Sequence, residues 1–259
     1  MRAVLKLSRA LSVLGIGLLA ACSDYAYVGM PQGQPSREVK IPDGTTRLIP
    51  VSASIVGLAY DQPRRRIFLR NLPGTQLQEL DRNGRVLRTF SAQRVPAGCG
   101  GVTPDDFPIK ECGLAVRGAD GHLFLDHPNG LMISELTRDG QFVRHIRLAQ
   151  PQGPIGGLAF DKNTGTLYVL FIRNRLIAEI DLNGTTKRVI RPTNPSVGAA
   201  LQIERFGLGI NAERRELYVA LQNGNRLGVL NMSGGLIATH NLSAGVTVEG
   251  IGGGRVFGF

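Results

Sequence analysis

The sequence predicts an all-β fold in which a four-stranded antiparallel sheet recurs around a ring. The first observation is a repeated opening, a glycine followed by a leucine, at the start of a short apolar run. The second is a turn glycine that follows each opening after 27 residues. The opening glycines are Gly57, Gly113, Gly157 and Gly207, and the turn glycines are Gly84, Gly140, Gly184 and Gly234. Self-similarity of this period indicates stacked copies of one supersecondary unit.

Each copy has the pattern of four short strands separated by turns. An apolar second strand begins at the same place in every copy, at Ile67, Leu123, Leu167 and Leu217. The third strands carry glutamates that alternate with leucine or isoleucine, at Glu79, Glu135 and Glu179. Such alternation predicts a strand with one solvent-exposed face and one buried face.

The two ends of the repeat region supply the halves of a fifth sheet. Residues 37–51 contain two alternating strands around an Asp43-Gly44 hairpin turn. Residues 249–259 contain an opening strand, a glycine turn and a second strand. Because an open array would leave a strand edge and an apolar face uncovered, we expect these halves to pair. The prediction is a closed ring of five blades, one of them a composite of the N- and C-terminal strands.

Residues 1–21 have the pattern of a secretory signal peptide. Arg2, Lys6 and Arg9 precede an apolar run that is too short to span a bilayer. The run ends in Leu-Ala-Ala-Cys, which resembles the lipobox of bacterial lipoproteins and implies that Cys22 is acylated, with palmitate among the expected chains. Ser23 stands where that family carries an aspartate for inner-membrane retention. The resemblance therefore implies an outer-membrane lipoprotein, with residues 22–36 as a flexible acylated tether that faces the periplasm.

Residues 94–112 form an insert between the first and second copies, within a domain expected to span residues 37–259. The insert contains Cys99 and Cys112, the two cysteines that remain once Cys22 is acylated. In an oxidising periplasm two such cysteines are expected to form a disulfide. Metal binding by this pair would need further ligands that the insert does not offer.

The formal charge of +10 raises the question of an anionic partner. The signal peptide argues against nucleic acid, so an envelope protein or an anionic envelope polymer is the expected partner beside the membrane itself. Arginines gather in the same first-to-second-strand turn of two copies, and they form the candidate binding surface. These are Arg64, Arg65, Arg66, Arg214 and Arg215. The alternative is that they are ordinary solvated turn residues.

Residues 157–184 read Gly-Leu-Ala-x-Asp, then Leu-Tyr-Val, then Glu-Ile-Asp-x-x-Gly. This pattern resembles the NHL-repeat and gluconolactonase-like β-propeller superfamily, and the resemblance extends over residues 37–259. It implies a β-propeller of four-stranded blades. Calcium-dependent lactonases of that superfamily hold their metal at the central mouth, which makes Glu249, Asp126 and Asn129 candidate ligands here. A single carboxylate at the mouth would supply only a small part of the ligand set, because Ca²⁺ binds six to eight oxygens.

Two functions remain open. The first is a non-enzymatic outer-membrane lipoprotein whose propeller is a binding or scaffolding platform, without cofactor or catalytic residues. The second is a metal-dependent hydrolase or lactonase at the central mouth. His127 beside Asp126 is a conceivable general base, although the loop is also ordinary turn sequence. Converging carboxylate and amide oxygens at the mouth would favour the enzyme, and an apolar, glycine-lined mouth would favour the platform.

Overall fold

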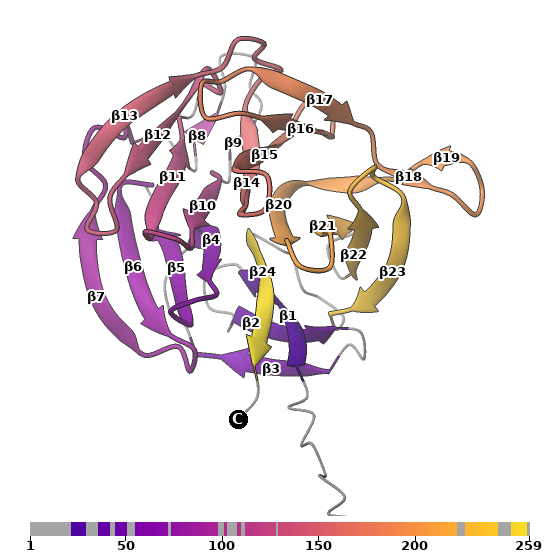
Figure 1. The fold of residues 1–259 in the computed structure, drawn as a ribbon, viewed down its shortest axis with the longest axis horizontal. Coiled ribbons are helices and arrows are strands. Elements are labelled where there is room, and N and C mark those ends of the chain that lie inside the picture. The colour runs from indigo at the N-terminus through magenta and orange to yellow at the C-terminus, as the bar shows by residue number, and fades with distance from the viewer. Residues whose placement is uncertain are drawn as a thin grey trace, which may run out of the picture.

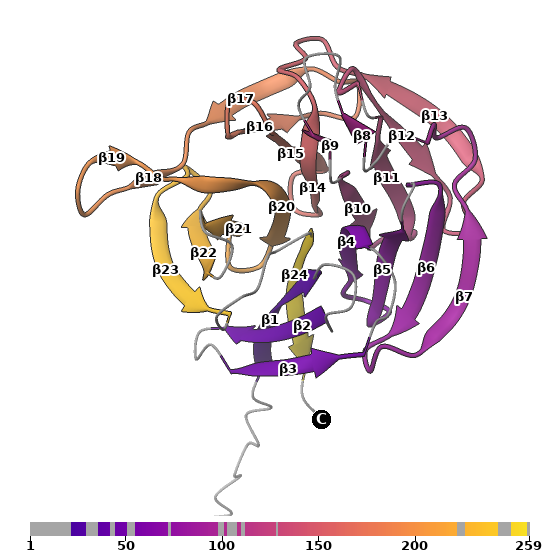
Figure 2. The same ribbon diagram turned by 180° about the vertical axis from the view of Figure 1, so that it is seen from behind.

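The protein is a five-bladed β-propeller, built entirely of strands and turns where the structure describes it (Figure 1). The computed structural model describes residues 22–29, 36–41, 45–50, 55–71, 74–97, 101–102, 108–109, 112–127, 129–221, 226–242 and 250–257. No stretch of these residues forms a helix that is long and apolar enough to cross a membrane. Seen from either side, the sheets surround one axis, with one strand of each nearest the centre (Figures 1 and 2).

Four blades follow the predicted repeat, each a meander of four antiparallel strands. Blade 1 is β4 (Ile55–Asp61), β5 (Arg66–Asn71), β6 (Gln76–Asp81) and β7 (Val86–Ser91). Blade 2 is β10 (Leu114–Arg117), β11 (His122–Asp126), β12 (Met132–Leu136) and β13 (Phe142–Arg147). Blade 3 is β14 (Ile155–Asp161), β15 (Thr166–Phe171), β16 (Leu176–Ile180) and β17 (Thr186–Ile190). Blade 4 is β20 (Ile203–Asn211), β21 (Glu216–Leu221), β22 (Arg226–Asn231) and β23 (Leu236–Asn241). The predicted fold class is confirmed.

The fifth blade is a composite of the two chain ends, as predicted, but the ends contribute unequally. Its strands, from the axis outward, are β24 (Gly250–Phe257), β1 (Cys22–Gly29), β2 (Ser36–Ile41) and β3 (Thr46–Ile49). The C-terminus therefore provides one long strand and the N-terminus provides three. The prediction of two strands from each end is wrong.

The predicted tether is also wrong over its first half, because residues 22–29 form β1. All eight of these residues pair with β24, from Cys22 opposite Phe257 to Gly29 opposite Gly250. Ala26 is 0% exposed and packs with Val39 and Tyr218, so β1 belongs to the core. The physical reason is that β24 would otherwise present an unpaired outer edge. Residues 30–35 lie outside the described part of the chain.

Two small hairpins decorate the disc. In the insert, β8 (Gly101–Val102) pairs with β9 (Pro108–Ile109). Between blades 3 and 4, β18 (Thr193–Asn194) and β19 (Ala199–Ala200) form a hairpin that projects from the rim (Figure 1). Cys112 is buried, whereas Cys99 lies outside the described residues. Their disulfide stays a prediction.

The turn glycines of the repeat have a backbone reason. All four have φ between +81° and +94°, which is left-handed backbone that a residue with a Cβ adopts at a cost. In blades 1 and 3 the turn is held further by an aspartate. Asp81 Oδ1 accepts hydrogen bonds from the N–H groups of Asn83 and Arg85, at 2.9 and 3.0 Å. These short turns connect the third and fourth strands of each blade.

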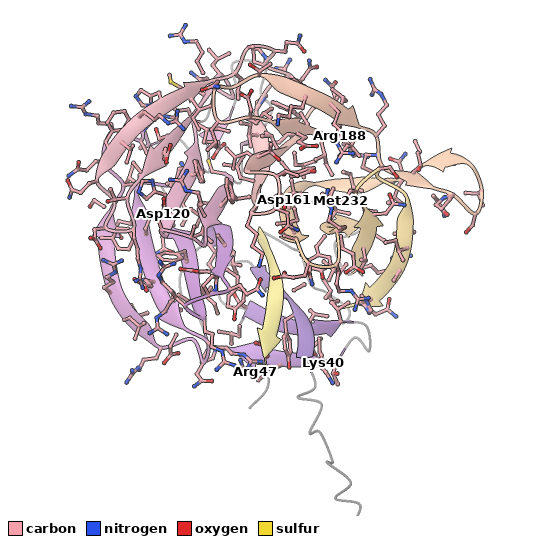
Figure 3. All side chains as sticks on the ribbon, in the orientation of Figure 1. Lys40, Arg47, Asp120, Asp161, Arg188 and Met232 are labelled. Carbon is pink, nitrogen blue, oxygen red and sulfur yellow. The ribbon has the colours of Figure 1, made fainter. Side chains whose placement is uncertain are left out.

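The third-strand glutamates are buried and not solvent-exposed, which corrects the expectation of a wet face. Neighbouring blades pack face to face through apolar side chains, which leaves these glutamates only 2–8% exposed. Each of these glutamates accepts a hydrogen bond from the Nε of an arginine nine residues later, at 2.6–3.1 Å, and Figure 3 labels two of the arginines, Arg47 and Arg188. The pairs are Glu38–Arg47, Glu79–Arg88, Glu135–Arg144 and Glu179–Arg188.

Two of these glutamates also join adjacent blades. Arg82 of blade 1 binds Glu38 of the composite blade at 2.9 Å, and Arg138 of blade 2 binds Glu79 of blade 1. Buried carboxylates are costly unless paired and hydrogen-bonded. The repeated pairs therefore stabilise the register between fourth and third strands and the contact between blades.

Candidate functional site

The innermost strands all run in one direction, which gives the disc two distinct faces. We call the face where they begin the glycine face, because Gly57, Gly113, Gly157 and Gly207 gather there around a small hollow. We call the face where they end the funnel face. Tyr60, Val116, Phe160 and Ile210, which lie near the ends of their strands, surround a larger hollow there.

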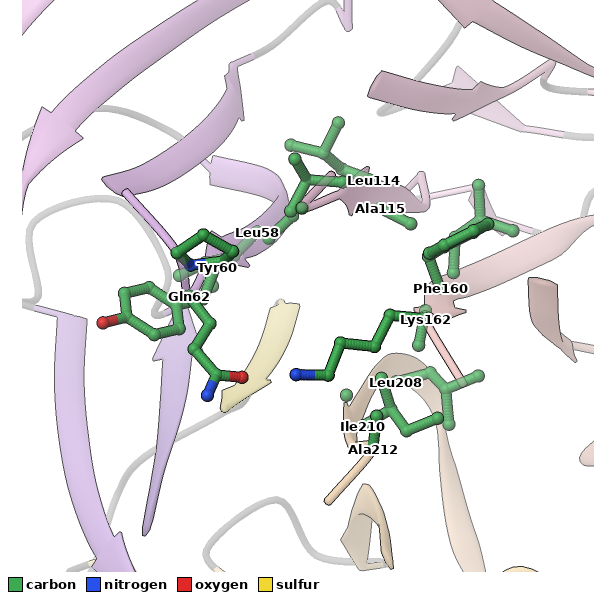
Figure 4. A pocket seen from close by; sticks show the side chains of 17 residues that line it. Leu58, Tyr60, Gln62, Leu114, Ala115, Phe160, Lys162, Leu208, Ile210 and Ala212 are labelled. Atoms are coloured by element: carbon green, nitrogen blue, oxygen red, sulfur yellow. The ribbon is translucent and has the colours of Figure 1, made fainter. Parts of the chain in front are cut away.

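The hollow on the funnel face is the candidate site. It is a small funnel with a cavity volume of about 60 Å³, which is below the roughly 300–1,000 Å³ of small-molecule pockets. Aliphatic and aromatic side chains dominate its wall, and Gln62 and Lys162 extend across the mouth (Figure 4). Four of five blades contribute described residues to the wall, so the ring itself forms the funnel.

A ring of leucines forms the floor of the funnel. Each leucine follows an opening glycine, and all four line both the funnel and the hollow on the other face: Leu58, Leu114, Leu158 and Leu208. They are 1–3% exposed. Among the described residues, these leucines therefore close the floor of the funnel.

The opening glycines let the inner strands approach each other closely enough for this ring to form. A Cβ on Gly157 would lie 2.7 Å from the backbone nitrogen of Leu208. A Cβ on Gly57 would lie 2.5 Å from the carbonyl oxygen of Cys112, whose N–H donates to the carbonyl of Val56 at 2.8 Å. Close backbone approach of this kind requires glycine.

The polar groups at the mouth bind one another. Lys162 Nζ forms an ion pair with Glu213, and Gln62 Nε2 donates to the same carboxylate at 3.3 Å. Asn163 Nδ2 donates to the carbonyl of Ala212 at 2.6 Å. Burial alone would raise the pKa of Glu213, but its hydrogen bonds and the charge of Lys162 together outweigh burial and lower that pKa. The rim is thus a small polar bridge between blades 1, 3 and 4 above an apolar wall.

The predicted arginine surface lies on this face, yet at least four of its five arginines have carboxylate partners within the fold. Arg64 binds Asp61 at 3.1 Å and the carbonyl of Gly118 in blade 2 at 2.8 Å. The other pairs are Arg66–Glu79, Arg214–Glu216 and Arg215–Asp161. Arg65 has a φ of 54°. These contacts stabilise the blades, and a role of the arginines in binding a partner stays a prediction.

Asp126, a candidate metal ligand, is instead held by a buried arginine. Arg70 Nη1 lies 2.6 Å from Asp126 Oδ1, and the two side chains are 0% and 1% exposed. The same guanidinium donates to the carbonyls of Gly74, Gly113 and Asp126 at 2.9–3.1 Å. Burial raises the pKa of Asp126 to about 6, and the charge of Arg70 opposes that rise.

The other candidate ligands are not brought to Asp126 by any described contact. Asn129 Oδ1 accepts a hydrogen bond from the N–H of Leu131 at 3.0 Å, and Glu249 lies outside the described residues. The described residues contain no group of three His, Cys, Asp or Glu side chains that could hold a metal ion. The calcium hypothesis therefore stays untested at Glu249 and receives no support from Asp126 or Asn129.

His127 contacts a serine and a second histidine, which the sequence did not suggest. Its Nε2 lies 2.8 Å from Ser134 Oγ, and Ser134 Oγ lies 3.1 Å from His145 Nδ1. Ser134 is 0% exposed, so its hydroxyl is closed to a substrate. Burial, together with the charges of His145 and Arg70, lowers the pKa of His127 to about 4. This neutral, buried imidazole is a structural group and not a general base at the funnel.

Comparisons with known proteins identify the fold. No protein-family model and no curated protein matches the sequence. The chain is similar to one in the crystal structure of a nidogen/laminin complex, with TM-score 0.56 and 13% identity over 89% of this chain and 98% of that one. It is also similar to Myxococcus xanthus glutaminyl cyclase, with TM-score 0.53 and 14% identity over 74% of this chain and 72% of that one. Identities this low show the β-propeller fold alone.

Proposed function

We propose that this protein is an outer-membrane lipoprotein whose propeller is a non-enzymatic binding module, with the funnel as its binding site. The observation that carries the proposal is the funnel itself, an apolar cavity on the axis with a polar rim. An apolar wall with a few polar groups at the rim is the usual lining of a binding site, and the small volume suits one apolar side chain. The ligand is an apolar side chain or chain segment of an envelope partner.

The groups around the funnel favour binding over catalysis. Lys162 and Glu213 neutralise each other at the mouth, and the wall below them is made largely of Leu, Ala, Val, Ile and Phe side chains. The hollow on the glycine face is lined by glycines, leucines and Cys112. This is the lining expected of a platform. No described contact favours the hydrolase or lactonase, so we do not propose it.

The anchor is supported by the signal peptide and the lipobox-like residues before Cys22. Several acyl chains on one cysteine hold a protein far more stably than a single chain does. A fold of this kind also occurs in the structure of a nidogen/laminin complex, which agrees with a role in binding and indicates no particular partner.

Filling the funnel tests the binding site. Ala212 lines it and is 7% exposed, whereas Ala119 lies on the same face, in an exposed turn outside the funnel. Both would be changed to phenylalanine, and each protein would be used to capture crosslinked partners from envelope extracts. We expect Ala212→Phe to lose capture about tenfold, the scale of one well-packed apolar contact, and Ala119→Phe to keep it. Equal capture by the two variants would remove the funnel from the proposal.

The anchor has a separate test. Cys22→Ala leaves no thiol for the acyl group, so the variant should leave the membrane pellet that retains the wild-type protein. A variant that still pellets with outer membrane after a high-salt wash would contradict the lipid anchor.

A further inference from the structure

We infer that the funnel face of the propeller lies against the surface of the membrane that holds the anchor, so that the funnel opens toward lipid. The inference rests on the proposed acylation of Cys22. It concerns a docking surface and commits to one occupant, the headgroup region of a phospholipid bilayer. Two steps carry it, the position of Cys22 in the fold and the length of chain that separates it from the core.

The strand register places the backbone of Cys22 at the funnel face. In blade 1, Asp61 at the end of β4 lies level with Arg66, and Arg66 lies level with Asp81 at the end of β6. The turn that follows β6 is therefore on the funnel face. Arg47, near the start of β3, donates to the carbonyl of Arg82 in that turn at 2.9 Å.

The strand ends on the funnel face can be followed from blade 1 through the composite blade to Cys22. β2 ends and β3 begins next to the contact between Arg47 and Arg82, so that end of the composite blade is also on the funnel face. Ile41, the last residue of β2, pairs with Asp24 near the start of β1. Cys22 then pairs with Phe257, the last residue of β24. Acyl chains on Cys22 consequently leave the protein from the face into which the funnel opens.

The chain between the anchor and the core is too short to let the disc turn over. Ala26 is 0% exposed, and only three residues separate it from Cys22. At about 3.3 Å per residue, Cys22 lies roughly 13 Å along the strand from Ala26. A flexible tether over residues 22–36 would have allowed about 20 Å of free reach and any orientation. With β1 paired from its first residue, the lipid surface and the funnel face are held together.

The distribution of apolar and charged residues on the funnel face also suits contact with lipid at its centre. Its middle is an apolar hollow, and its charged turn residues are paired with one another around that hollow, as Lys162 is with Glu213 and Arg215 with Asp161. Paired charges lower the cost of bringing this face to the interface. A ligand of the funnel would then be presented by the membrane surface.

The test uses the absence of tryptophan from the natural sequence. One tryptophan would be placed at each end of β6, by Asn83→Trp on the funnel face and Gln76→Trp on the glycine face. Both positions are exposed, both replace an amide side chain, and β6 spans about 16 Å between its ends. The full-length acylated variants would be reconstituted into phosphatidylethanolamine–phosphatidylglycerol vesicles whose acyl chains are brominated near the headgroup.

Flotation of the vesicles comes first, and tryptophan fluorescence second. We expect both variants to float with the vesicles, with Asn83→Trp quenched about twofold, because tryptophan partitions to the interface, and Gln76→Trp not quenched. Floating protein with equal quenching of the two tryptophans, or with the stronger quenching at position 76, would overturn the inferred orientation and leave the anchor standing. Failure to float would contradict the anchor, and the proposed function with it.

Discussion

Asp126 and His127 are adjacent in blade 2, and the fold shifts their pKa values in opposite directions. Burial raises the pKa of Asp126 from 3.8 to about 6, against the opposing charge of Arg70. Burial, with the charges of His145 and Arg70, lowers the pKa of His127 from 6.5 to about 4. Because each shift is a difference between the folded and unfolded states, each makes the free energy of unfolding depend on pH.

The two contributions have opposite signs over the same pH range. The contribution of Asp126 is fully present below pH 3.8 and is lost as the pH rises through about 6. The contribution of His127 is fully present above pH 6.5 and is lost as the pH falls through about 4. At 1.4 kcal/mol per pKa unit, each is worth about 3 kcal/mol. In the wild-type protein they largely offset each other, so only single substitutions reveal them.

We therefore predict opposite pH profiles for Asp126→Asn and His127→Gln. Urea unfolding, followed by circular dichroism from pH 4 to pH 7, gives the free energy of unfolding for both variants and the wild type. Wild type minus Asp126→Asn should fall by about 3 kcal/mol as the pH rises, and wild type minus His127→Gln should rise by about 3 kcal/mol. Taking differences removes the titration of the other carboxylates, which both proteins share.

The Asp126→Asn variant alters the surroundings of a buried arginine as well as removing a titrating group. Asp126→Asn changes the hydrogen bonds to the buried Arg70 guanidinium, which adds an offset that does not vary with pH to the difference curve. If that variant does not fold, His127→Gln still tests the reasoning, because Gln keeps a polar group near Ser134. Differences that stay flat with pH to within about 0.5 kcal/mol, or that share one sign, would refute the assignment of these shifts to burial.

Three further predictions follow from the fold. Deleting residues 250–257 or residues 22–29 should abolish cooperative thermal unfolding, because either deletion removes an inner strand of the composite blade and opens the ring; an unchanged midpoint for either would contradict the closure. Gly157→Ala should lower the free energy of unfolding by about 1–3 kcal/mol through overpacking against Leu208, and by more than Gly165→Ala, where no atom lies within 4 Å and only the backbone cost of about 1 kcal/mol applies. Thiol titration of the unfolded, non-reduced mature protein should find no free cysteine, and a reactive Cys99 or Cys112 would refute the disulfide.

The sequence was sufficient for the ring because the repeat carries its own physical requirements. The opening glycines are needed for close approach of the inner strands, and the turn glycines for positive φ. Both are fixed in position, so the spacing of 27 residues between them recurs in each of the four blades. The need to cover strand edges then predicted that the chain ends would share a blade.

The number of strands that each chain end supplies to the composite blade could not be predicted in the same way. β24 is rich in glycine and is the one strand described at the C-terminal end, and β1 follows directly after residues whose pattern predicts a signal peptide. The alternation of Tyr25, Tyr27 and their neighbours does indicate a strand. Pro31 and Pro35 beyond it favoured a linker. Which strand completes a sheet depends on partners distant in sequence, and local pattern does not contain that information.

The candidate site was only partly accessible from sequence for a similar reason. The apolar residues of the funnel wall did not stand out in the sequence, because a strand end that lines a cavity has the same apolar pattern as one that packs against a neighbour. Asp126 and Glu249 were candidate metal ligands because carboxylate oxygens bind Ca²⁺. Only the structure shows that Asp126 meets Arg70, which lies 56 residues earlier in the chain. Pairing partners decide whether a carboxylate is a ligand or part of the core.

The number of strands that each chain end supplies also decides which face the anchor occupies. Successive strands of a blade alternate in direction, so adding one strand at the N-terminus moves the start of the chain to the other face of the disc. With two N-terminal strands, as the sequence predicted, the chain would begin on the glycine face at β2. With three, it begins on the funnel face at Cys22. Closing the ring with one C-terminal strand therefore also brings Cys22, the proposed acylation site, to the funnel face, and an anchor on the other face would require a differently closed ring.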